Sequence, residues 1–388
     1  MVPLIPLDIV DLIADHLSAS LPDRQTQERR DIGTALCLVC RDWREVGLKL
    51  AWGDCFVGVV FPPRTAESDF FRLVRNKDVA RSIRRLRVAS SSAEWPAGTQ
   101  RGLLLEVCPS LRELQIGSSR AVVEEALQLP SDIDDYPTLQ SLQLGVATVG
   151  LDASSKRPLG CILSSFPSLE TFFLRDSAPS TASDISVASS HPPSIAAYPS
   201  PALHNLSLSF SSLDPSAMSQ TLPLLHFSSA HIQTLILGVL PSFDPLANAL
   251  GACTALHTLR LTLTPDAFSA ALLALPHTFS SSSLSFKELV LTAASHLPRP
   301  LVSTPSHSPS PSTLSHFLSS LPLSLTTLRI AHPAAELDAA VLEAFPPTRL
   351  EGELRSFEVQ SLGRFLAFEK KVEEGEKVWV RQGRRRSM

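Results

Sequence analysis

The most regular feature of the chain is a hexapeptide whose first, fourth and sixth residues are apolar. Its third and fifth residues are mostly polar, as in residues 111–116 (LRELQI). Ten copies start at Ile83, Leu111, Leu139, Leu169, Leu203, Ile232, Leu256, Phe286, Leu325 and Leu354. Successive copies start 24 to 39 residues apart, and most start 28 to 30 residues apart. A short apolar motif that recurs at this period is typical of a solenoid, in which each repeat packs against its neighbours.

The alternation within each copy predicts a β-strand with two different faces. The fourth and sixth residues are expected to point into the core, and the third and fifth to point away from it. Leu114 and Ile116 are therefore predicted core residues, whereas Glu113 and Gln115 are predicted to lie on the opposite, concave face of a parallel sheet.

The concave face is the candidate binding surface of the repeats. Phe173 and Ile236 place apolar side chains near its middle, and charged residues lie toward its ends. An apolar centre with a polar rim is the usual anatomy of a protein-binding surface, although a solvated face has a similar pattern. The candidate target-binding residues are Arg85, Arg87, Glu113, Gln115, Gln143, Phe173, Ile236 and Arg260.

Helix signals lie between many of the hexapeptides. Asp214, Asp244 and Thr264 each precede a proline and a run of apolar residues, the pattern of a helix N-terminus. Residues 102–107 and 337–345 are also predicted helices. One strand and one helix in about 28 residues resemble the unit of a leucine-rich repeat, and residues 83–361 resemble that family. The fold class that follows is α/β: a solenoid of about ten strand–helix repeats.

Two stretches interrupt the predicted repeats, at residues 178–202 and 293–312. Both are rich in Ser and Pro and have too few apolar residues to order themselves, so we predict flexible inserts. Their Ser-Pro steps are either phosphorylation sites or simple spacers. Residues 362–388 are predicted to cap the last repeat, and their Arg384–Arg386 run is either a localisation signal or a solvated tail.

The first 54 residues predict three short helices. Pro6 and Asp8 suit the start of the first helix. Residues 21–30 are charged and predict a loop, after which Asp31 is placed to cap the second helix. A third helix is expected around Leu50, and residues 55–82 are predicted to form a strand and a helix that lead to the repeats.

These helices resemble the F-box in three places: residues 5–10 (IPLDIV), 36–43 (LCLVCRDW) and 50–52 (LAW). The chain departs from the family in Asp8, where glutamate is usual, and in the charged stretch before the second helix. The resemblance implies binding to the Skp-type adaptor of a cullin–RING ubiquitin ligase. The adaptor contacts that it implies are Pro6, Ile9, Val10, Ile13, Val39, Cys40 and Trp43, which a purely local reading would assign to the helical core.

Composition restricts the alternatives. The net charge of −4 argues against nucleic acid as the main partner, and no apolar run reaches the length of a membrane span. The N-terminus lacks the pattern of a signal peptide. The six cysteines lie in apolar surroundings, which favours reduced thiols in an intracellular protein. The Cys37–Cys40 pair has no second ligand pair nearby, so its spacing fits a helix face better than a zinc site.

No catalytic motif stands out, and the acidic cluster Asp132, Asp134 and Asp135 is more typical of a solvated loop than of a metal site. We therefore predict a protein that is no enzyme and needs no cofactor. With the resemblances, the predicted function is that of a target-recognition subunit of an SCF-type ubiquitin ligase in ubiquitin-dependent degradation, located in the cytoplasm or nucleus. The alternatives are an interaction scaffold outside ubiquitylation and an enzyme of unknown class.

Overall fold

The computed structural model describes most of the predicted repeats and helices. The residues described are 6–20, 26–58, 67–89, 104–118, 136–146, 163, 165–176, 203–209, 225, 229–281, 286–294, 309–332, 354–361, 364–373 and 376–382. They form two compact units: unit 1 is Met1–Glu170 with Leu174–Ser177, and unit 2 is Thr171–Phe173 with Ala178–Met388. The helix predicted at residues 337–345, all but the last residue of the helix predicted at residues 218–225, the acidic cluster and most of both inserts lie outside the described residues.

Unit 1 begins with three helices, α1 (Leu7–Ser20), α2 (Thr26–Val39) and α3 (Arg44–Trp52). Their core contains Val10 and Ala14 of α1 together with Val46 and Leu50 of α3. The second helix begins five residues before Asp31, so the prediction of a loop through residue 30 was wrong. The reason is local packing: Arg29 is buried, and its guanidinium lies 3.8 Å from the Asp54 carboxylate.

The first strand, β1 (Asp54–Gly58), follows α3 directly and is itself a degenerate copy of the hexapeptide. Cys55 and Val57 are buried and pair in register with Leu86 and Val88, the fourth and sixth residues of the next copy. The boundary expected between residues 54 and 55 therefore falls inside this strand. The three helices join the first strands without an intervening linker.

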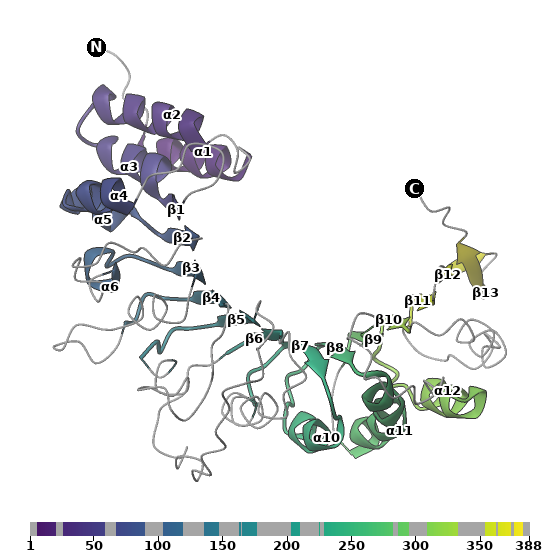
Figure 1. Ribbon diagram of the computed structural model, residues 1–388. Helices are drawn as coiled ribbons and strands as arrows, with labels where there is room; N and C mark the ends of the chain where they lie inside the picture. The colour runs from purple at the N-terminus through teal and green to yellow at the C-terminus, as the bar shows by residue number, and fades with distance from the viewer. Residues whose placement is uncertain are drawn as a thin grey trace, which may run out of the picture. The chain divides into compact units, whose positions relative to one another are not determined.

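The single helix predicted between the strand near residue 55 and the first repeat is two helices, α4 (Glu67–Val74) and α5 (Lys77–Ser82). The side chain of Asn76 accepts a hydrogen bond of 3.1 Å from the backbone N–H of Asp78, which caps α5 and breaks the helical run. A short helix, α6 (Leu104–Val107), follows β2, and Figure 1 shows α4, α5 and α6 on one side of the first strands.

Parallel strands connect the repeats of each unit. Unit 1 contains the parallel run β1, β2 (Arg85–Ala89), β3 (Glu113–Ser118) and β4 (Ser141–Val146). The strand β5 (Thr171–Asp176) contributes residues to both units. Unit 2 contains the parallel run β6 (Asn205–Ser209), β7 (Thr234–Leu240), β8 (Thr258–Leu263), β9 (Glu288–Ala293), β10 (Thr327–Ala331) and β11 (Ser356–Ser361).

The predicted core positions of the hexapeptide are confirmed at all ten copies. The first, fourth and sixth residues of every copy are buried, as in Leu111, Leu114 and Ile116. Equivalent residues of neighbouring copies pair directly, so Leu114 lies beside Leu142 and Ile116 beside Leu144. Because each strand lines up the same positions as the next, buried rows of apolar side chains, one for the fourth and one for the sixth residues, run along the parallel strands of each unit.

A second repeated contact lies just before most of the parallel strands. The backbone N–H groups of the second and third residues of one copy donate to the carbonyl of the second residue in the copy before it. Arg112 and Glu113 donate in this way to Arg84, at 2.7 and 3.0 Å, and Lys287 and Glu288 to His257, at 2.8 and 3.0 Å. The shared acceptor fixes the register before the strand begins.

Helices cover one face of the strands in unit 2. They are α10 (Asp244–Gly251), α11 (Pro265–Ser281) and α12 (Pro311–Ser319), and Figure 1 shows them along the same side of β7 to β10. Thr264 caps α11 as predicted, accepting a hydrogen bond of 3.2 Å from the Ala267 N–H. The second insert was predicted to reach Ser312, but α12 already begins at Pro311, with Ser310 as its cap.

The chain ends in an antiparallel hairpin that the sequence did not predict. Strands β12 (Arg364–Glu373) and β13 (Glu376–Gln382) pair with each other, and β12 pairs with β11. Phe368 of β12 is buried and stacks on Phe357 of β11, with ring centroids 6.0 Å apart. The hairpin thus continues the core past the last parallel strand.

Candidate protein-interaction surfaces

The first candidate surface is on the N-terminal helices. Ile9, Leu12 and Ile13 of α1 are exposed, and so are Leu38 and Val39 at the end of α2, with Leu12 70% and Leu38 83% exposed. We call these five residues the exposed apolar set. They are five of the seven large hydrophobic residues that are exposed in the described part of the chain, the others being Leu273 and Leu323.

The predicted adaptor contacts do not all belong to this set. Pro6, Ile9, Ile13 and Val39 are exposed, and Cys40 is half-buried. Val10 is only 3% exposed and packs with Val46 and Leu50, so its assignment to the contact surface is corrected to the helical core. Trp43 is half-buried and packs against the same core.

Leu12 and Leu38 are exposed apolar residues that the sequence reasoning left out. Both lie one residue from a predicted contact, and both are apolar in a short helix that has more apolar residues than one stripe needs. This excess of apolar residues was the sequence signal that more of them than predicted would be exposed. Which of these residues faces the core depends on α3, which packs against both α1 and α2.

Polar contacts join the N-terminal helices to one another, to α5 and to the first strands of unit 1. Asp54 lies between two arginines, 3.8 Å from Arg29 of α2 and 3.4 Å from Arg85 of β2. The Arg30 guanidinium lies 4.7 Å from the centre of the Trp52 ring. Arg44 of α3 donates a hydrogen bond of 3.0 Å to Asp78 of α5. The exposed apolar set is thus carried on helices that are fixed to the strands.

The second candidate surface is formed by the third and fifth residues of the repeats, which we call the outward strand face. Of its predicted residues in unit 1, Glu113 and Gln115 are exposed, while Arg85, Arg87 and Gln143 are half-buried. Arg85 lies beside Glu113 in the register, and Gln115 beside Gln143. The Arg85 side chain also forms an ion pair with Asp54, so Arg85 has a structural role in addition to its place on this face.

The outward strand face of unit 2 combines apolar and charged side chains. Phe173 and Ile236 are half-buried, and Arg260 is exposed. Ile236, Arg260 and Val290 are direct neighbours in the register of β7, β8 and β9. Ser207 departs from the prediction, because this fifth residue of its copy is buried.

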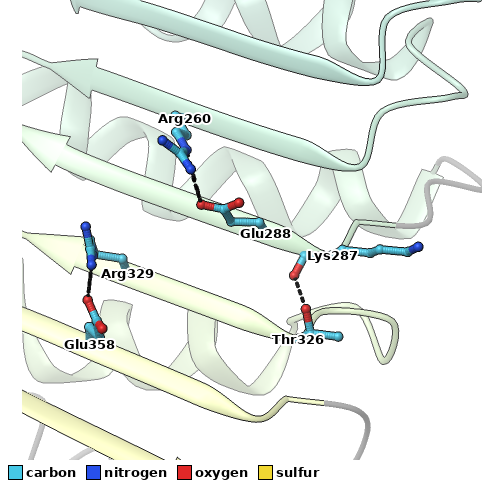
Figure 2. Close-up of polar contacts among 6 residues, drawn as sticks. All are labelled: Arg260, Lys287, Glu288, Thr326, Arg329 and Glu358. Atoms are coloured by element: carbon cyan, nitrogen blue, oxygen red, sulfur yellow. Dashed lines mark hydrogen bonds and ion pairs between the residues drawn. The ribbon is translucent and has the colours of Figure 1, made fainter. Parts of the chain in front are cut away.

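The outward strand face of unit 2 also carries two ion pairs that the sequence analysis did not predict. The Arg260 Nη2 lies 2.8 Å from the Glu288 Oε1, and Arg329 pairs with Glu358 through a hydrogen bond of 2.6 Å from its Nε. Figure 2 shows all four side chains on the side of the strands turned away from the helices. The residues of each pair are 28 and 29 positions apart, so only the strand register brings them together.

Three of the five described cysteines, Cys55, Cys108 and Cys253, are buried, and so is Tyr136. Burial raises the pKa of the Cys55 and Cys108 thiols to about 12 and that of Cys253 to about 11. Burial also raises the pKa of Tyr136 to about 12, and its hydroxyl donates to the Cys108 carbonyl. Such groups stay protonated at neutral pH and act in packing rather than as nucleophiles.

The described residues contain no group of three or more His, Cys, Asp and Glu side chains placed to hold a metal ion. None of the helices described is both long enough and apolar enough to cross a membrane.

Comparison with known proteins does not assign a family. No protein-family model matches the chain, and a search of curated proteins gives no match. The structure itself establishes an α/β architecture with mostly parallel strands.

Proposed function

We propose that this protein is a target receptor of an SCF-type ubiquitin ligase. In this proposal the helices α1 to α3 are an F-box that binds a Skp-type adaptor and, through it, a cullin–RING ligase. The strands that follow are leucine-rich repeats, and their outward face binds a target protein. The chain performs no chemistry, but raises the rate of ubiquitin transfer by holding the target near the ligase.

The observation that carries the proposal is the exposed apolar set. The helical core already has its own residues, among them Val10, Val46 and Leu50. Ile9, Leu12 and Ile13 therefore remain in contact with water, and covering them would recover part of the roughly 1.5–3 kcal/mol that full burial of such a side chain provides. Clusters of exposed apolar side chains of this kind mark interaction surfaces.

The fixed attachment of the helices supports the same proposal. Asp54 connects α2 to the first two strands, and the Gly53 carbonyl accepts N–H groups from Arg84 and Arg85, at 2.9 and 2.8 Å. An adaptor bound to the helices would thus hold the first strands of unit 1 in a defined orientation. A receptor that brings its target close to the ligase needs such a rigid connection between the adaptor-binding helices and the target-binding strands.

The test is co-purification of the full chain with a Skp-type adaptor and a cullin. Recovery of both proteins supports the ligase role, and loss of both in an Ile9→Asp/Ile13→Asp variant supports the assigned surface. Leu273→Asp/Leu323→Asp is the matched control because it adds the same two charges at exposed apolar residues of unit 2. Recovery of the adaptor without a cullin favours the alternative function, an interaction scaffold outside ubiquitylation. Recovery of neither contradicts the ligase proposal.

A further inference from the structure

The two arginines of the outward strand face in unit 2 are held in the same way. Arg260 directs both Nε and Nη2 to a single oxygen of Glu288, at 3.1 and 2.8 Å. Arg329 directs the same two nitrogens to a single oxygen of Glu358. In each pair the glutamate engages one edge of the planar guanidinium, and the Nη1 group has no protein partner among the described residues.

The arginines are more open to solvent than the glutamates that hold them. The side chains of Arg260 and Arg329 are 49% and 51% exposed, whereas those of Glu288 and Glu358 are 29% and 19% exposed. The outer layer of the face therefore presents guanidinium donors, and the carboxylates lie beneath them. A guanidinium that is already oriented loses less conformational freedom when it binds a second carboxylate.

The spacing of the two arginines indicates how far apart the two carboxylates of a ligand should lie. In the fifth-residue row Arg260 lies beside Val290, and Val290 lies beside Arg329, so one strand separates the two arginines. Adjacent strands are about 4.8 Å apart, which places the two positions about 10 Å apart. In a polyproline II segment, residues three positions apart lie on the same side and about 9 Å apart. Val290 offers an apolar contact between the two arginines.

The charge around the pair favours an acidic ligand. Lys287 and Arg355, just before β9 and β11, are exposed. Among the second, third and fifth residues of the described β8 to β11 copies, the only acidic ones are Glu288 and Glu358, which already pair with the two arginines. This local excess of positive charge contrasts with the net charge of −4 of the whole chain. An acidic segment would thus be attracted to this part of unit 2.

We propose that the outward strand face of β8 to β10 binds an acidic segment of a protein target, in an extended polyproline-type conformation, through carboxylates three residues apart. One carboxylate binds Arg260 and the other binds Arg329. This inference rests on the proposed target-binding role of the face and names the chemical class of the target.

The test uses the purified full chain and fluorescein-labelled twelve-residue peptides of Ser, Pro and Ala. One peptide contains two Asp residues three positions apart, a second contains them two apart, and a third has Asn in their place. Fluorescence anisotropy is expected to show the tightest binding for the first peptide. Arg260→Gln/Arg329→Gln should weaken this binding about tenfold or more, because charge-assisted hydrogen bonds are lost.

The matched control is Arg75→Gln/Arg81→Gln, which removes the same charge from exposed positions of unit 1 and should leave binding unchanged. Equal loss in both variants, equal binding of the Asn peptide, or tighter binding of a phosphoserine peptide or a DNA oligonucleotide would overturn the inference. Circular dichroism of each variant verifies that it is folded. The peptide measurement needs no adaptor, so the two proposals can fail separately. If the chain binds the adaptor but not the acidic peptide, only this inference is rejected. If it binds the acidic peptide but not the adaptor, only the ligase role is rejected.

Discussion

Gly33 of α2 and Gly47 of α3 face each other so closely that neither has room for a side chain. A Cβ atom on either residue would lie 2.5 Å from the carbonyl oxygen of the other, and one on Gly33 would also lie 2.7 Å from the Ala51 Cβ. The two helices thus pack with their backbones in contact. This contact sets the position of Leu38 and Val39, which follow Gly33 on α2.

We expect Gly33→Ala to destabilise the helices of unit 1 by about 1–3 kcal/mol, because the helices must move apart to admit the methyl group. Thermal unfolding followed by circular dichroism, with hydrogen exchange of the α2 and α3 amides, measures the effect. The control is Gly251→Ala, where the added Cβ has no neighbour within 4 Å and should be tolerated. Equal stability of the two variants would refute the close contact.

Asp54 should contribute more to stability than the other ion pair between the N-terminal elements. We expect Asp54→Ala to cost about 1–3 kcal/mol, because it removes the carboxylate beside the buried Arg29. Arg44→Gln removes the half-exposed pair with Asp78 and should cost about 1 kcal/mol or less. Urea unfolding of the two variants gives the comparison, and the reverse order would contradict the role given to Asp54.

His332 should make unit 2 less stable in mild acid. Its side chain is buried, its ring centroid lies 5.0 Å from that of Phe268, and burial lowers its pKa below the usual 6.5. Below pH 6.5 the unfolded chain binds a proton that the folded chain resists, so the free energy of unfolding falls as the pH drops toward the folded pKa. The slope from this group is at most about 1.4 kcal/mol per pH unit.

Urea unfolding between pH 5 and pH 8 checks this prediction, since His332→Leu should reduce the pH dependence. His277→Gln, on the exposed side of α11, should leave it unchanged. An identical pH dependence in wild type and His332→Leu would exclude the assigned role.

Val239, at the end of β7, has a φ of 50° and is the single described non-glycine residue with a positive φ. The β7–β8 register shifts between Leu237 and Leu240, so the strained residue lies in a bulge. We expect Val239→Gly to retain or raise the thermal midpoint, because glycine adopts this conformation without strain. Val290→Gly, in the regular strand β9, should lower it. A similar loss in both variants would show that Val239 is not strained.

The alternation along the hexapeptides was sufficient to place the buried residues of the repeats. It placed Leu114, Leu259 and Leu328 in the core correctly because a strand has only two faces and one of them must be apolar. The first strand was predicted near residue 55, but it was not recognised as a copy of the hexapeptide, because Gly53 and Asp54 stand at its second and third positions. Its signal, Trp52 with Cys55 and Val57 at the first, fourth and sixth positions, was too weak to recognise without the register.

The candidate surfaces were only partly predictable. A short helix with apolar residues on several sides does not reveal which of them meets α3, so Val10 was taken for a contact and Leu12 was left out. The ion pair of Arg260 and Glu288 depends on how two copies 30 residues apart align, because the copies start at Leu256 and Phe286. That alignment results from the backbone contacts before each strand, which the side-chain pattern does not encode.

The most direct measurement of the central claim is calorimetric titration of a purified Skp-type adaptor into the full chain and its variants. We expect a 1:1 complex with the wild-type chain, and a loss of affinity of tenfold or more in Leu12→Asp and in Leu38→Asp, residues chosen because they are exposed and not part of the helical core. Leu273→Asp should bind as the wild type does. An adaptor that fails to bind the wild-type chain, or that binds all three variants equally well, would contradict the proposed role of the N-terminal helices.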